Sequence, residues 1–93
     1  MIGSTVLRAN EVGGNRELSI KIYSDRLYQV EEREDGRKAY KSNPVGKWDA
    51  IRYFKNVIHS ISPKKGIYYR VVEGVWIEDY RTHLTRFDPK MGG

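Results

Sequence analysis

Four side chains that could bind an anion recur at helical spacing in the middle of the chain. They are Trp48, Arg52, Lys55 and His59, separated by four, three and four residues. Residues at this spacing share one face of an α-helix, because the helix makes one turn in about 3.6 residues. Such a stripe could follow a nucleic-acid backbone, with its cations on phosphates and Trp48 stacked on a base or sugar. A charged stripe on a helix can equally be a face that only meets water.

Positive charge is concentrated in the segment that contains this stripe. Residues 47–70 hold six Lys or Arg and one acidic residue, Asp49, so they account for the whole net charge of +5. A local surplus of one sign raises the surface potential and favours a partner of the opposite sign. We therefore predict a nucleic-acid-binding surface in which cations contact phosphates and rings stack. Its predicted members are Trp48, Arg52, Lys55, His59, Lys64, Lys65, Tyr68 and Arg70.

A second group of aromatic residues falls on segments that we expect to be strands. Tyr23, Trp76 and Tyr80 would lie on the sheet face that the helix does not cover. A face that meets only water does not normally carry this many rings, and Tyr and Trp are enriched at protein interfaces. We therefore expect these three residues to contact a second copy of the chain, in a homodimer, or another protein. Rings on a sheet could also stack the bases of a single strand.

The chain offers little for catalysis or for binding a metal ion. It has no cysteine, and its two histidines, His59 and His83, stand at no ligand spacing to a carboxylate on a predicted helix. The loop at residues 13–16 contains two glycines but lacks the Lys-Ser/Thr of a phosphate-binding P-loop. We expect a non-enzymatic protein with no catalytic residue, metal or cofactor.

The elements that position these residues begin with strands. In Glu17–Ser24, apolar and polar residues alternate, which is typical of a strand with one buried face. The pair Asp35-Gly36 is a strong signal for a two-residue hairpin turn. The predicted strands of the first half are Ser4–Asn10, Glu17–Ser24, Leu27–Glu34 and the short, charged Arg37–Lys41.

One amphipathic helix follows these strands. Asn43 could cap it, Pro44 fits its first turn, and Pro63 forces its end after about Ile61. Its apolar arc consists of Ala50, Ile51, Phe54, Val57, Ile58 and Ile61.

The last third of the chain predicts two more strands. Ile67–Val72 and Val75–Arg81 both alternate, and Glu73-Gly74 would form the turn between them. The order β-β-β-β-α-β-β indicates an α+β fold, with a mostly antiparallel sheet of five to six strands and the helix packed on one face. We expect residues 1–93 to be a single domain, with residues 88–93 as a frayed tail.

The composition also indicates a cellular compartment. No apolar run approaches the roughly 20 residues that a spanning helix needs, and the first residues lack the pattern of a signal peptide. Together with the absence of cysteine, this favours a cytoplasmic or other reducing intracellular compartment and no membrane partner.

Three functions remain in view. The leading hypothesis is a non-enzymatic nucleic-acid-binding domain, for DNA or RNA, and the alternative is a small protein-interaction module, such as a regulator or inhibitor. A remote alternative comes from the terminal Gly92-Gly93, which resembles the end of ubiquitin-like modifiers and sulfur-carrier proteins. That resemblance implies a β-grasp fold, in which a helix lies between two hairpins. Salt separates the first two hypotheses, because phosphate contacts weaken steeply as salt rises.

Overall fold

The sheet is built from the hairpins that the sequence predicts. The computed structural model describes residues 1–87 of the chain, apart from the side chains of residues 71–72 and 83–87. Its strands are β1 (Thr5–Glu11), β2 (Arg16–Ser24), β3 (Leu27–Glu34), β4 (Arg37–Lys41) and β5 (Tyr69–Glu73). They form one antiparallel sheet in the order β4-β3-β2-β1-β5. Asp35 and Gly36 both have positive φ, 55° and 80°, as the predicted hairpin turn requires.

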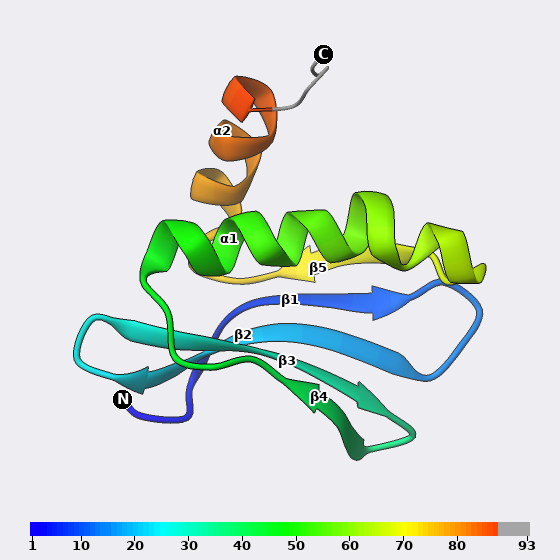
Figure 1. Cartoon of the computed structure of the whole chain (residues 1–93), viewed down its shortest axis with the longest axis horizontal. Helices are drawn as coiled ribbons and strands as arrows, with labels where there is room; N and C mark the ends of the chain where they lie inside the picture. The colour runs from blue at the N-terminus through cyan, green and yellow to red at the C-terminus, as the bar shows by residue number, and fades with distance from the viewer. Residues whose placement is uncertain (88–93) are drawn as a thin grey trace.

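A helix crosses one face of this sheet and leaves the other face uncovered (Figure 1). The helix α1 (Lys47–Asn56) continues as a π-helical turn, η1 (Val57–Ile61), and then as a 3₁₀ turn, η2 (Pro63–Lys65). The predicted α+β class, with an antiparallel sheet and one amphipathic helix, is therefore confirmed.

The start of the helix differs from the prediction. Val45 forms an isolated bridge with Tyr28, and each backbone N–H donates to the other's carbonyl at 2.8 Å. This extended pairing holds residues 43–46 beside β3, so α1 begins only at Lys47, and Gly46 rather than Asn43 is its cap residue. The helical end before Pro63 is as predicted, although its last turn is π-helical.

The core lies between α1 and the covered face of the sheet. Leu7, Leu18, Ile20 and Val30 from the strands are fully buried against Ile51 and Phe54 of α1. The predicted apolar arc is confirmed, since Ala50, Ile51, Phe54, Val57 and Ile58 are buried and Ile61 packs against them.

The segment after β5 is a helix, not the predicted strand. After Gly74 the chain turns away and forms α2 (Ile77–Phe87). Gly74 has a φ of 150° and lies so close to β1 that an added Cβ would collide with the backbone of Val6 and Leu7. Trp76 and Tyr80 are four apart, so they satisfy the period of a helix as well as that of a strand. Glu78 and Asp79 in the first turn favour the helix by complementing its dipole.

The first turn of α2 closes one side of the core. The ring of Tyr80 packs edge-on against Phe54 with centroids 5.7 Å apart, and Trp76 meets Tyr28 at 4.5 Å. An ion pair between Lys47 Nζ and Asp79 Oδ2, 2.7 Å apart, links the two helices. The cover of the sheet is thus α1 together with the start of α2.

Candidate functional site

The uncovered side of the sheet, here called the open face, is polar and charged. Side chains alternate along each strand, so the residues between the buried ones point away from α1. The register sets residues of five strands next to one another, for example Lys41, Glu31 and Ser19 across β4, β3 and β2. The charged residues of the open face are Arg8, Glu17, Lys21, Glu31, Arg33, Lys38, Lys41, Arg70 and Glu73.

Glu31 lies at the centre of the open face and organises the cations around it. It is 3% exposed, and its carboxylate accepts Lys21 Nζ at 3.1 Å and an Arg33 nitrogen at 3.0 Å. Burial alone would raise the pKa of Glu31, but the hydrogen bond from Lys21 and the charges of Lys21, Arg33 and Lys41 outweigh it and leave the pKa below its usual value. The ionised carboxylate therefore holds cations in a fixed array that remains positive.

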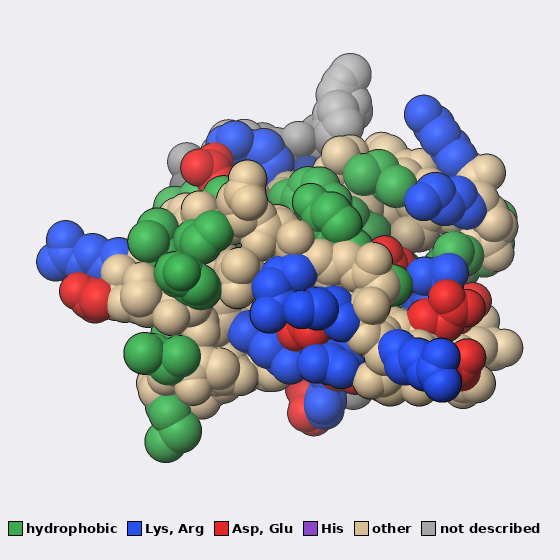
Figure 2. Space-filling model, turned by 60° about the horizontal axis from the view of Figure 1, so that its bottom comes forward, with side chains coloured by type: hydrophobic (Ala, Val, Ile, Leu, Met, Phe, Trp, Pro, Cys, Tyr) green, Lys and Arg blue, Asp and Glu red, His purple; other side chains and the backbone are tan. Residues whose placement is uncertain are grey.

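Three other cations on this face form no ion pair with a described residue. Among the described residues, no ion pair involves Lys38, Lys41 or Arg70, whereas Arg8 is paired with both Glu17 and Glu73. Six cations against three carboxylates leave the charged set with a surplus of three. Figure 2 brings the bottom of the molecule forward and shows Lys and Arg side chains gathered over its middle, with a few Asp or Glu among them.

Two exposed tyrosines lie on the open face. Tyr23 alternates with Lys21 along β2 and is 48% exposed. Tyr68 precedes Tyr69, whose hydroxyl donates to Glu32 on the covered side, so Tyr68 shares the open side with Arg70. Tyr68 is 58% exposed. Rings this accessible, one beside Lys21 and the other beside Arg70, can stack on planar ligands.

The predicted stripe on α1 is not a continuous exposed surface. Lys55 is buried, at 8% exposure, and its neighbour Phe54 packs against Tyr80 of α2. The Nε2 atom of His59 lies 3.2 Å from the hydroxyl of Tyr80, so the histidine joins the two helices. Arg52 is exposed but paired with Asp49 at 3.1 Å, and Trp48 is half exposed with Lys47 Nζ over its ring. The prediction that these four side chains form one accessible stripe is wrong.

The predicted protein interface is also mostly wrong. Trp76 and Tyr80 are 8% and 5% exposed, because the turn before α2 and the start of α2 pack on the core and are not a strand with an uncovered face. Burial raises the pKa of Tyr80 to about 12. Tyr23 alone of the three is exposed.

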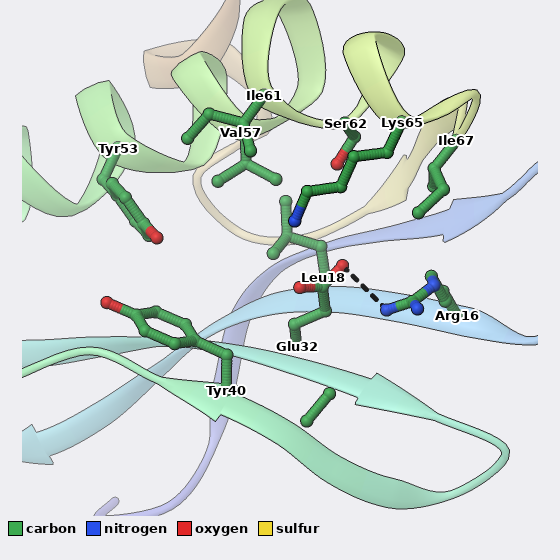
Figure 3. Close-up of a pocket in the computed structure, with 11 residues that line it drawn as sticks. Arg16, Leu18, Glu32, Tyr40, Tyr53, Val57, Ile61, Ser62, Lys65 and Ile67 are labelled. Carbon is green, nitrogen blue, oxygen red and sulfur yellow. Dashed lines mark hydrogen bonds and ion pairs between the residues drawn. The ribbon is translucent and has the colours of Figure 1, made fainter.

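A cleft lies on the covered side of the sheet. It lies between β4 and the turns after α1, with a cavity volume of about 330 Å³. Figure 3 shows Tyr53 and Tyr40 facing each other across its mouth, and Lys65 reaching into it from η2. Its lining residues are Arg16, Leu18, Glu32, Ala39, Tyr40, Tyr53, Val57, Ile61, Ser62, Lys65 and Ile67.

The charges in this cleft largely satisfy one another. Arg16 is paired with Glu32 at 3.4 Å and with Glu34 at 3.1 Å, and the Tyr69 hydroxyl donates to Glu32 at 2.6 Å. Burial and the contact with Glu32 raise the pKa of Tyr69. Burial, together with the neighbouring Tyr40, raises the pKa of Tyr53 to about 12. The cleft is thus a polar cluster that ties the end of α1 to the sheet.

The predicted residues fall into separate groups. Tyr68 and Arg70 lie on the open face, Lys64 and Lys65 are exposed in η2, and Arg52 lies on α1. The structure does not bring them together. Sequence reasoning missed the charges of β2, β3 and β4, although the Asp35-Gly36 turn fixes the pairing of Arg33 with Lys38. That cross-strand register was the signal that could have placed these charges on one face.

Comparison with known proteins gives no information about the function. No family model, curated protein or solved structure matches the chain. Within residues 1–87, no helix is long and apolar enough to cross a membrane. The same residues contain no group of three or more His, Cys, Asp or Glu that could hold a metal ion. Gly92 and Gly93, and the predicted tail, lie outside the described residues.

Proposed function

We propose that the protein is a non-enzymatic nucleic-acid-binding domain that contacts phosphates through the open face of its sheet. One observation carries the proposal: Lys38, Lys41 and Arg70 lie on a single face, and no ion pair involves them within the described part of the chain. Cations that form no ion pair are available to displace the counterions of a nucleic-acid backbone.

The array around Glu31 supports the same function. Its carboxylate uses part of the charge of Lys21 and Arg33 and fixes the position of both side chains. Cations held in place lose less conformational entropy when they meet a phosphate. The proposed interface therefore combines a fixed centre with freer cations on β4 and β5.

This interface replaces the one expected on α1. Lys55 of the helix stripe is buried, and His59, although exposed, lies 3.2 Å from the Tyr80 hydroxyl. The protein-interaction alternative is weakened in the same way, since two of its three rings are buried. The homodimer stays a prediction.

Fluorescence anisotropy of labelled single- and double-stranded DNA and RNA, at low and at physiological salt, tests the proposal. We expect binding whose affinity falls with salt. Lys38→Glu with Lys41→Glu should abolish it at physiological salt. Restoring one lysine should recover part of the salt slope, since each phosphate contact contributes about 0.7 to 0.9 to the slope of log K against log salt.

A matched double variant controls for net charge. Arg52→Glu with Lys64→Glu makes the same change in charge on exposed residues outside the open face. It should bind nearly as well as the unchanged protein. Equal losses in the two variants, or no binding at low salt, would contradict the proposed interface.

A further inference from the structure

We infer that the ligand is a single strand whose bases stack on Tyr23 and Tyr68, at the two ends of the open face. This inference rests on the proposed function and adds the form of nucleic acid and the length of the site. It depends on the placement of the two rings and on the shape of the surface between them.

The two tyrosines are far apart along the sheet. Next to Tyr23, the Ile22 N–H donates to the Ser4 carbonyl, and the Val12 N–H donates to the Tyr68 carbonyl. Ser4 and Val12 flank β1 and are eight residues apart. At a rise of about 3.3 Å per residue, the rings are separated by roughly 25 Å along the strand direction. Two neighbouring bases cannot reach both.

The surface between the rings carries cations from three strands. Lys21 adjoins Tyr23, Arg70 adjoins Tyr68, and Arg8 lies on β1 between them. A backbone that runs from one ring to the other passes over these cations. Tyr23 and Tyr68 are 48% and 58% exposed, so each has a free face for a base.

A single strand fits this arrangement and a duplex does not. The bases of a duplex are stacked on one another and paired, so they cannot offer a face to a protein ring, whereas unpaired bases can. At the 3.4 Å per nucleotide of a stacked strand, a site of about 25 Å spans about seven nucleotides. A more extended strand spans the same distance with fewer nucleotides.

The length of the oligonucleotide is the first test. Oligothymidylates and oligouridylates of 4, 8 and 12 nucleotides, with a 12-base-pair duplex, are titrated by anisotropy at one salt concentration. We expect a large gain in affinity from 4 to 8 nucleotides, little gain in intrinsic affinity from 8 to 12, and weaker binding of the duplex. The two series show whether DNA or RNA is preferred.

Three tyrosines of similar exposure provide the matched variants. Tyr23→Ala and Tyr68→Ala should each weaken binding of the 8-mer by about fivefold to a hundredfold, the range for loss of one stacked base. Tyr23→Phe and Tyr68→Phe should retain it, since they keep the ring. Tyr40→Ala is the control, because Tyr40 is 45% exposed but lies on the covered side. The thermal midpoint of each variant shows that it is folded.

The outcomes distinguish failure of the single-strand inference from failure of the proposed function. If Lys38→Glu with Lys41→Glu abolishes binding but the tyrosine variants bind normally, the open face binds nucleic acid and the single-strand inference is wrong. Tight binding of the duplex, or equal affinity for 4 and 8 nucleotides, overturns it as well. If no oligonucleotide binds at low salt, the proposed function itself fails.

Discussion

Glu31 and Glu32 are neighbours in the chain, and they point to opposite faces of the same sheet. Each is the centre of a polar cluster. The Glu31 carboxylate forms ion pairs with Lys21 and Arg33. The Glu32 carboxylate forms an ion pair with Arg16 and accepts a hydrogen bond from the Tyr69 hydroxyl. The two clusters differ in the balance between cations and carboxylates. Around Glu31 cations are in surplus, whereas Arg16 is shared between Glu32 and Glu34. The same residue type therefore supports a positive surface on one face and an internally satisfied cluster on the other.

The strongest way to break the covered face is to empty its core. Phe54 is fully buried in the middle of the contact between α1 and the sheet. Phe54→Ala should lower the free energy of unfolding by about 3–5 kcal/mol, because it leaves a cavity. Urea denaturation measures this change, and Tyr23→Ala on the open face should change stability by less than about 0.5 kcal/mol. An unchanged midpoint for Phe54→Ala would contradict the described packing.

Replacing each glutamate separates stability from binding. Glu31→Gln and Glu32→Gln should both lower the free energy of unfolding by about 1–3 kcal/mol, since each removes the negative charge and one of the two acceptor oxygens that face the cationic partners. Only Glu31→Gln should tighten nucleic-acid binding and steepen its salt dependence, because it frees Lys21 and Arg33 for phosphates. Urea denaturation and anisotropy measure the two effects. Equal binding changes in the two variants would remove the distinction between the faces.

A smaller effect should appear on acidification. The pKa of Glu31 is lower in the folded protein than its ordinary value of 4.5 in the unfolded chain. Its contribution to stability is therefore complete above pH 4.5 and is lost as the pH falls through the folded-state pKa. The stability difference between the unchanged protein and Glu31→Gln should shrink over that range. A difference that stays constant down to the lowest pH would show that the pKa of Glu31 is not lowered on folding.

The sequence predicted the elements whose pattern is local. The alternation of β2 and the Asp35-Gly36 turn identified the meander, and the apolar arc around Phe54 identified the face of α1. The segment after Gly74 was misassigned because a run of seven residues with Trp76 and Tyr80 fits both periods. Its helical form depends on the close approach to β1 and on packing against α1, which are tertiary contacts.

The errors at the site have more than one cause. Lys55 has the sequence context of a surface residue, but it is buried in the structure. Trp76 and Tyr80 were expected on a sheet face because the segment after Gly74 was misassigned as a strand. Tyr68 and Arg70 were predicted as binding residues by charge and ring type, and the register of β5 now sets them on the open face. Glu31 could not be recognised as a buried centre, because its cations come from two other strands as well as its own.

The β4 strand has a consequence for how copies of the protein behave at high concentration. Every residue of β4 is exposed, and β4 forms an edge of the sheet, so its outer backbone groups could template another strand. Arg37, Lys38 and Lys41 would then face the same cations on the second copy. Electrostatic repulsion between like edges therefore opposes edge-to-edge growth into fibres, and neutralising these charges, by substitution or by a polyanion, lowers that barrier.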